Sequence, residues 1–198
     1  LTFVPDSIQH PHQAMRVNVE GTMNLLEACR TRLPHSRFLY VSTSEVYGPP
    51  SVLPVREEHP LNPQNPYAIS KAAADLYCAY LYESTGYHVI RMRPFNHSGP
   101  GQSDQFVLSS FAHQIARAEA GATEPIVRVG NLEARRDFLH VDDVVRAYAL
   151  AARNGVAGEA YNIASGTAVS IHDALQTLLG MAAARIAVEP DPERLRPV

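Results

Sequence analysis

Short apolar runs and longer amphipathic segments alternate along this chain. The apolar runs, which predict strands, cover residues 37–42, 88–93, 126–129, 161–164 and 186–188. The amphipathic segments, which predict helices, cover residues 11–30, 66–83, 106–120, 144–153 and 171–179. Strands that alternate with helices are typical of a parallel sheet covered by helices on both faces. The pattern therefore predicts an α/β fold.

Proline, glycine and small polar residues mark where these elements begin and end. Asn65-Pro66 ends an irregular stretch and opens a helix, because proline is favoured at the first helical position. Residues 48–66 are dense in proline and predict a long loop that covers part of the molecule. Residues 96–102 predict a functional glycine- and proline-rich loop. Asp142 is expected to cap the helix that follows it.

Composition narrows the class of protein. The chain has 198 residues, of which 45% are hydrophobic and 19% charged, and these are ordinary values for a soluble globular protein. A formal charge of −3 offers no basic surface for nucleic acid, and no long uncharged apolar run predicts a membrane span. Cys29 and Cys78 fall in predicted helices and suggest a reducing compartment, so we expect a cytoplasmic protein. The histidines lack metal-ligand spacing, and no metal site is expected.

Tyr67 and Lys71 lie four positions apart in a predicted helix and therefore share one face of it. Thr43, 24 residues before the tyrosine, follows a predicted buried strand. The lysine ammonium would favour the phenolate and lower the tyrosine pKa, and the threonine hydroxyl could hold a substrate oxygen beside the phenol. These residues predict a proton-transfer site for carbonyl and alcohol chemistry. Taken alone, the tyrosine and lysine are more typical of an ordinary surface pair.

Five ordered segments extend the pattern over nearly the whole chain. They are V-N-V-E-G-T-M-N-L-L-E-A at 17–28, S-T-S-E-V-Y-G at 42–48, P-Y-A-I-S-K at 66–71, R-R-D-F-L-H-V-D-D at 135–143 and A-Y-N-I-A-S-G at 160–166. Through them the chain resembles the extended short-chain dehydrogenase/reductase family, the NAD(P)-dependent nucleotide-sugar epimerases, dehydratases and reductases. The resemblance implies an NAD(P)-binding Rossmann-type parallel sheet with a smaller substrate-binding lobe.

The resemblance also implies how the chain divides. Residues 1–96 and 137–165 would form part of the dinucleotide-binding domain, and residues 97–136 and 166–198 the substrate-binding lobe. Relatives often dimerise through two helices from each subunit, so a homodimer is expected for the intact protein.

The glycine-rich turn with which the family binds phosphate, G-x-x-G-x-x-G, does not occur in this chain. The first glycine of the chain is Gly21, which lies inside a predicted helix. We therefore expect the N-terminal part of the Rossmann domain to be missing, roughly 70 residues at about 30 per βα unit. The chain would then be an incomplete fragment of an enzyme.

The family resemblance assigns roles to the residues of the expected site. Tyr67 would be the general acid/base, and Lys71 would tune it and bind the nicotinamide ribose. Thr43 would hydrogen-bond the reacting sugar oxygen. Ser42 and Pro94, at the ends of two predicted strands, would complete the binding site for the cofactor, NADP or NAD.

The expected substrate is a GDP-sugar. The stretch F-N-H-S-G-P-G-Q at 95–102 is similar to the form found in family reductases that convert GDP-4-keto-6-deoxy-D-mannose to GDP-D-rhamnose. In the related GDP-mannose 4,6-dehydratases, F-N-H is followed by E-S-P-R-R-G. Asn96, Arg136 and Arg196 would contact the substrate, the two arginines at its diphosphate.

Two alternatives stay open. Glu45 stands where family dehydratases carry a catalytic glutamate, which reductases also keep, and Thr43 stands where the reductases often have serine. A GDP-mannose 4,6-dehydratase, or another NAD-dependent nucleotide-sugar epimerase or dehydratase, is therefore the alternative enzyme. The non-enzyme alternative is a nucleotide-sensing or structural relative without turnover.

Overall fold

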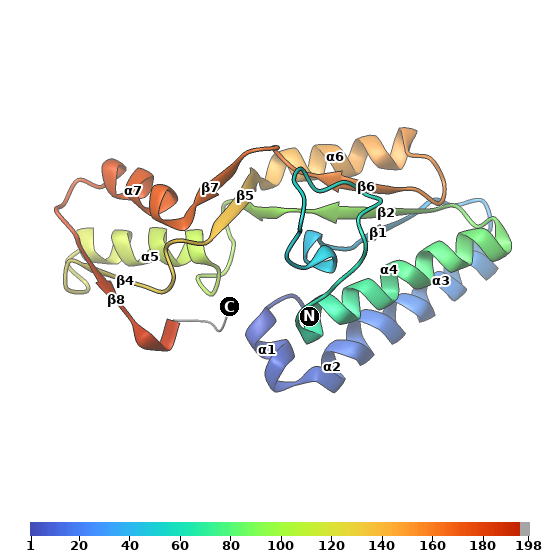
Figure 1. Cartoon of the computed structure of the whole chain (residues 1–198), viewed down its shortest axis with the longest axis horizontal. Coiled ribbons are helices and arrows are strands. Elements are labelled where there is room, and N and C mark those ends of the chain that lie inside the picture. Colours follow the sequence, from blue (N-terminus) through green and yellow to red (C-terminus); the bar gives the residue numbers. More distant parts are fainter. Residues whose placement is uncertain (195–198) are drawn as a thin grey trace. The chain divides into compact units, whose positions relative to one another are not determined.

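The computed structural model describes residues 1–194 and divides the chain into two units. The first unit comprises Leu1–Phe95 and Val141–Ala164, and the second comprises Asn96–His140 and Ser165–Val198, of which residues 195–198 lie outside the described part. Each unit has its own sheet and its own buried cluster of side chains (Figure 1). None of the helices within residues 1–194 is both long and apolar enough to cross a membrane.

The first unit is built on three parallel strands. They are β1 (Phe38–Val41), β2 (Val89–Pro94) and β6 (Ala160–Ile163), in the order β1-β2-β6. Val41 lies opposite Met92, and Pro94 lies opposite Ile163. Because the strands are parallel, their carboxyl ends share one edge of the sheet, which is where open α/β sheets bind ligands.

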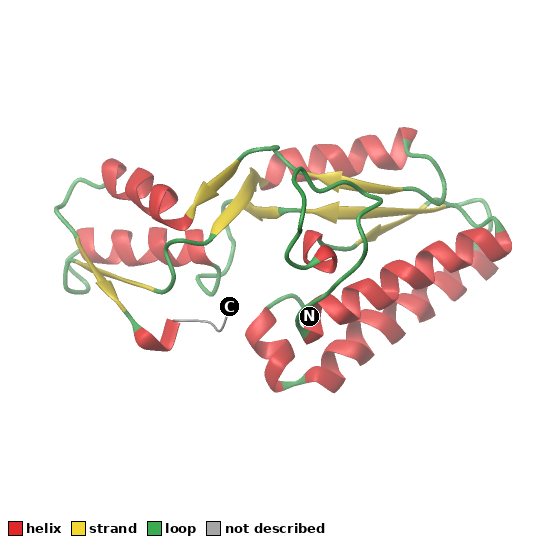
Figure 2. Ribbon diagram, viewed as in Figure 1, coloured by secondary structure: helices red, strands yellow, loops and turns green. Residues whose placement is uncertain are grey.

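Helices cover both faces of this sheet. Helix α4 (Pro66–Thr85) packs on β2 beside α3 (Gly21–Arg32), and α6 (Val141–Asn154) lies on the opposite side of the strands (Figure 2). The core between α3, α4 and the sheet is apolar and buried, and it consists of Leu26, Tyr40, Ala74, Cys78, Leu81, Tyr87 and Val89. This arrangement confirms the prediction of a parallel sheet covered on both faces.

The beginning of the chain is less regular than a single helix. Helix α1 (Val4–Gln9), which was not predicted, precedes α2 (Pro11–Met15), and a π-helical turn, η1 (Arg16–Glu20), joins α2 to α3. At this turn the Thr22 hydroxyl donates a hydrogen bond to the Asn18 carbonyl oxygen at 2.7 Å, in competition with the backbone.

The second unit contains two small sheets. In one, β3 (Asn96–Ser98) pairs parallel with β5 (Arg135–His140), which pairs antiparallel with β7 (Ala168–Ser170). In the other, β4 (Ile126–Val129) pairs parallel with β8 (Ala187–Pro190). Helices α5 (Val107–Glu119) and α7 (Ile171–Met181) contribute to one apolar cluster with β4, formed by Phe111, Ile115, Val127, Val129, Ile171 and Leu175.

Three expectations differ from the structure. Residues 96–98, predicted as loop, form strand β3 because β5 supplies hydrogen-bond partners some forty positions away. Asp142 does not cap α6, which begins at Val141, so the aspartate lies within its first turn. Residues 137–140, expected in the dinucleotide domain, belong to the second unit because β5 continues through them while paired with β3 and β7.

Candidate active site

Tyr67 lies in the first turn of α4, and two hydrogen bonds and a proline stabilise that turn. Asn65 is the N-cap, and its side-chain oxygen accepts a hydrogen bond from the Ala68 backbone N–H at 2.8 Å. Pro66 occupies the first helical position. The Tyr67 backbone N–H donates to the Ser7 hydroxyl at 3.1 Å, so helix α1 helps to satisfy the start of α4.

Thr43 brings the end of β1 to the tyrosine. The chain leaves β1 through Ser42 and enters a short 3₁₀ turn, η2 (Ser44–Tyr47), whose first backbone N–H groups need acceptors. The Thr43 hydroxyl oxygen accepts from the Glu45 backbone N–H at 3.3 Å. The same hydroxyl is close enough to the Tyr67 side chain to lower the pKa of its phenol, so the predicted hydroxyl and phenol are neighbours.

The pKa of Tyr67 moves in the direction opposite to the one predicted. Burial raises it to about 12, while the hydrogen bond with Thr43 lowers it and the nearby Glu45 carboxylate raises it. The prediction that Lys71 lowers this pKa is wrong for the described structure, because desolvation of the phenolate outweighs the other influences. At neutral pH Tyr67 is therefore an uncharged phenol that can donate its proton.

Lys71 points at the end of β1. Its ammonium donates a hydrogen bond to the Val41 carbonyl oxygen at 2.5 Å and lies 4.6 Å from the centre of the Tyr40 ring. Burial lowers the pKa of Lys71 to about 8. The group is thus mostly an ammonium at neutral pH and loses its proton in mildly alkaline solution.

Glu45 lies beside the start of α4. Its carboxylate accepts a hydrogen bond from the Asn65 side-chain amide at 3.0 Å, so the N-cap residue also orients this acid. Its charge is near enough to Tyr67 to raise the phenol's pKa. The Glu45 carboxylate, a base, and the Tyr67 phenol, an acid, thus lie near each other after the end of β1.

Ser42 and Pro94 occupy the same edge of the sheet. Both are buried, and the Ser42 backbone N–H donates to the Met92 carbonyl oxygen at 2.7 Å, which continues the pairing of β1 with β2. The six candidates of the first unit therefore gather around the carboxyl ends of β1 and β2 and the start of α4: Ser42, Thr43, Glu45, Tyr67, Lys71 and Pro94.

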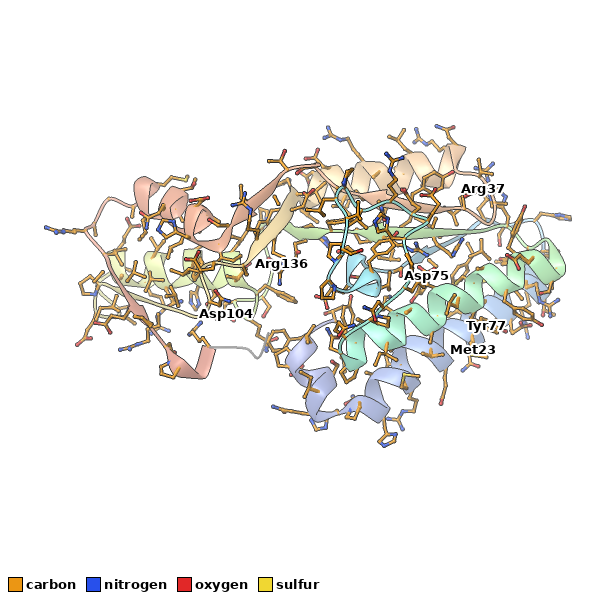
Figure 3. The ribbon with its side chains drawn as sticks, in the orientation of Figure 1. Met23, Arg37, Asp75, Tyr77, Asp104 and Arg136 are labelled. Carbon is orange, nitrogen blue, oxygen red and sulfur yellow. The ribbon has the colours of Figure 1, made fainter. Side chains whose placement is uncertain are left out.

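The substrate-binding candidates belong to the second unit. Asn96 is exposed in β3, opposite Phe138 in β5. Arg136 is exposed in β5, and its guanidinium donates to the Arg135 carbonyl oxygen at 2.8 Å (Figure 3). Arg196 lies outside the described residues.

A cavity of about 560 Å³ opens in the second unit between α5 and the residues around β4. Three arginines line it, Arg117, Arg128 and Arg194, together with the carboxyl groups of Asp104 and Glu124. Arg194 is held in place by donating to the Ser110 hydroxyl at 3.1 Å. The lining therefore suits a ligand that carries both negative charge and hydrogen-bond donors.

Sequence reasoning missed a group of buried polar residues behind the candidate site. Asp75 follows Lys71 by one helical turn, and Arg91 and Arg93 alternate on an otherwise apolar strand. Both spacings were signals that charged side chains meet inside the unit, since charges are rarely buried unless paired. Asp75 accepts hydrogen bonds from both arginines.

The chain is similar in sequence to proteins of one known family. A family model described as GDP-mannose 4,6 dehydratase matches residues 1–194. The chain is 40% identical over 197 residues to the GDP-6-deoxy-D-mannose reductase of Pseudomonas aeruginosa, covering 98% of this chain and 65% of that protein. It is 37% identical over 193 residues to a dTDP-glucose 4,6-dehydratase of Actinoplanes sp., covering 96% and 58%. The chain thus spans less than two thirds of the length of these relatives.

A solved structure agrees with these relatives. The structure of a protein named RMD from Pseudomonas aeruginosa, complexed with NADPH, superposes with a TM-score of 0.93 at 40% identity and covers 98% of this chain and 68% of that one. The match includes both units, because it extends over nearly the whole chain.

Proposed function

Because the chain belongs to the GDP-mannose 4,6 dehydratase family, we propose that the protein reduces the 4-keto group of GDP-4-keto-6-deoxy-D-mannose to give GDP-D-rhamnose. The observation that carries this proposal is the pair of Tyr67 and Thr43, a neutral, partly buried phenol beside a hydroxyl that lowers its pKa. The relative at 40% identity over 98% of the chain is a reductase of this kind, and the stretch 95–102 has the reductase form.

In this reaction Tyr67 acts as the acid. Its phenol keeps its proton at neutral pH because its pKa is about 12, and it delivers that proton to the sugar oxygen as the carbonyl becomes an alcohol. The Thr43 hydroxyl, which lies beside the phenol, holds the same oxygen in line.

The first unit fits the nicotinamide end of NADPH or NADH. An ammonium has three N–H donors, and the bond to the Val41 carbonyl oxygen engages one of them, so Lys71 can also bind ribose hydroxyls. Tyr67, Ser42 and Pro94 would complete the site at the shared edge of the strands. When bound, the cofactor supplies the hydride.

We assign the GDP part of the substrate to the second unit, which makes this unit the substrate-binding lobe and the first unit the dinucleotide-binding domain. The three arginines of the cavity favour phosphate, and Asp104, although paired with His113 at 2.9 Å, can accept from a base N–H. Asn96, Arg136 and Arg196 are proposed as further contacts to the substrate. The lobe would then hold the nucleotide while the first unit supplies the chemistry.

We also propose that the protein is a homodimer. Ile69, Leu76 and Tyr80 form an exposed stripe on α4 at helical spacing, and Leu25 on α3 is exposed as well. A second copy of the same helices would cover these side chains.

The free cysteines Cys29 and Cys78 suit the reducing conditions of the cytoplasm, where we place the enzyme.

A dehydratase acting on GDP-mannose is the second candidate, and the position of Glu45 favours it. The carboxylate is oriented by Asn65 near Tyr67, where it could remove a proton next to a keto group.

One experiment separates the two. The full-length protein is given GDP-4-keto-6-deoxy-D-mannose with reduced cofactor, or GDP-mannose, in separate tubes, and absorbance near about 340 nm is followed. The proposed function predicts loss of absorbance only with the keto sugar. Conversion of GDP-mannose without net oxidation of the cofactor would identify the dehydratase, and no turnover of either sugar would favour a relative that only binds nucleotides.

A further inference from the structure

A buried ion pair joins helix α4 to strand β2 behind the candidate site. Asp75, labelled in Figure 3, is fully buried, and Arg93 is 3% exposed. Two hydrogen bonds link them, from Nε at 3.0 Å and from Nη2 at 2.8 Å. Burial raises the pKa of Asp75, but the bonds and charge of Arg93 outweigh it and hold this pKa below its ordinary value. Such a pair is stable only when its remaining donors also have partners.

The remaining N–H groups of Arg93 reach the turn and the loop that follow β1. Its Nη1 donates to the Tyr47 hydroxyl oxygen at 2.8 Å and to the Glu57 carbonyl oxygen at 3.0 Å. The guanidinium carbon also lies 5.1 Å from the centre of the Tyr47 ring. Tyr47 ends η2, the same short turn that contains Glu45 and begins directly after Thr43.

Tyr47 also contacts strand β6. Its hydroxyl donates to the side-chain oxygen of Asn162 at 2.8 Å. The Asn162 backbone N–H in turn donates to the Glu57 carboxylate at 2.7 Å, and its side-chain amide donates to the Val55 carbonyl oxygen at 3.2 Å. The proline-rich loop between η2 and α4 is therefore tied to two strands at residues 55–57.

We propose that Tyr47 is a positioning residue of the reaction, whose hydroxyl fixes the turn bearing Thr43 and Glu45 against strands β2 and β6. The inference rests on the proposed function, since it concerns the same proton transfer. The Thr43 hydroxyl must stay in line with the Tyr67 phenol, and a displacement of about 1 Å in such a site can cost about 100-fold in rate. Tyr47 itself need not touch the substrate.

The chain offers a matched control for the hydroxyl. Tyr87 is 4% exposed, as is Tyr47, and its hydroxyl is also paired, with the Ser36 hydroxyl at 2.8 Å. It packs in the core between α3, α4 and the sheet and has no contact with η2 among its described hydrogen bonds. Tyr47→Phe and Tyr87→Phe therefore each remove one hydroxyl from a buried tyrosine, the first inside the network and the second outside it.

The test compares kcat, KM and the midpoint of urea unfolding for the two variants in the full-length protein. We expect Tyr47→Phe to lower kcat on the order of 10-fold while KM changes less than about 2-fold, because binding by the second unit is untouched. Tyr87→Phe should leave kcat within about 2-fold. Both should lower the unfolding midpoint, and Tyr47→Phe should lower it more, because its hydroxyl makes two hydrogen bonds and one of them is to a buried guanidinium. Equal kcat values for the two variants would overturn the proposal.

Hydrogen exchange provides a readout that does not depend on the substrate. Tyr47→Phe should speed the exchange of backbone amides at residues 43–47 and 55–62, and Tyr87→Phe should not. A second pair tests the loop tether: Glu57→Ala should give the same exchange pattern, whereas Glu58→Ala, at an exposed neighbour, should not. Unchanged exchange in Tyr47→Phe would refute the tether even if the sugar substrate proved to be a different one.

Discussion

At the scale of single residues, Tyr67 and Lys71 both depart from their ordinary pKa values because both are buried. The helical spacing and the threonine upstream were sufficient to select these side chains from the sequence. The direction of the tyrosine's shift was not predictable in this way, because it depends on how completely neighbouring elements exclude water. Tyr148 of α6 is one such neighbour, since the charge of an ionised Tyr67 raises the pKa of Tyr148.

Lys71 gives a pH-dependent prediction at this scale. Its pKa of about 8 in the folded protein lies below the ordinary 10.5, so the unfolded chain binds this proton more tightly. Burying the ammonium therefore costs stability below about pH 8, and the cost disappears as the pH rises towards 10.5. Between about pH 8 and pH 10.5, the free energy of unfolding of the wild type should therefore rise relative to that of Lys71→Met. The expected rise is on the order of 3 kcal/mol, since each pKa unit corresponds to about 1.4 kcal/mol.

Urea unfolding at several pH values between 7 and 10.5 measures this difference. The comparison with Lys71→Met cancels the other titrating groups, which both proteins share. A difference that stays constant over this range would show that Lys71 has an ordinary pKa.

At the scale of elements, the sequence predicted those whose signals are local. Asn65 and Pro66 open α4 as expected, and Ser170 caps α7 through a bond from the Asp173 backbone N–H at 2.9 Å. Strands β3, β5 and β7 were missed. β3 and β7 have three residues each and depend on pairing with β5, and half of the residues of β5 are charged. The π-helical turn η1 was missed because it breaks no hydrophobic period.

Gly48 tests how tightly the turn after β1 is packed. Its φ of +63° favours glycine, and an added Cβ would lie 2.1 Å from the Asn62 carbonyl oxygen. Gly86, at the end of α4, has a φ of +71°, but a Cβ added there would have no neighbouring atom within 4 Å. Gly86→Ala should therefore cost about 1 kcal/mol for its backbone alone, and Gly48→Ala at least about 2 kcal/mol more.

Equilibrium unfolding of the two glycine variants checks this order. Equal losses of stability would mean that the backbone conformation alone matters and that the loop around Asn62 yields freely. A larger loss for Gly48→Ala, accompanied by a lower kcat, would connect the packing of this turn with the proton-transfer site.

At the scale of the whole molecule, the repeated alternation of strands and helices predicted the α/β class and the parallel sheet. The expected division into a dinucleotide-binding domain and a substrate-binding lobe stays a prediction. Its boundaries differ from those of the two units at Asn96, at residues 137–140 and at Ser165. Charge pairs such as Asp75 with Arg93 were beyond the sequence analysis, because their partners lie on different elements. The oligomeric state belongs to this scale and stays a prediction.

The dimer proposal predicts which exposed apolar residue matters. Leu76 on α4 is 57% exposed and Val145 on α6 is 56% exposed, so they form a matched pair. Leu76→Glu should convert the dimer into a monomer because it places a charge in the proposed contact, whereas Val145→Glu should not. Light scattering after size-exclusion chromatography measures the mass of each variant. A monomeric wild type, or equal effects of both changes, would contradict the proposed contact surface.

The central claim is that the Tyr67 phenol donates the proton that completes reduction of the sugar ketone. The most direct measurement is the initial rate of oxidation of the reduced cofactor with GDP-4-keto-6-deoxy-D-mannose, in the wild type and in Tyr67→Phe. We predict that this variant loses on the order of 1,000-fold in kcat while its affinity for GDP is unchanged, because only the acid has been removed. Turnover of the keto sugar by Tyr67→Phe at more than about a tenth of the wild-type rate would contradict the assignment.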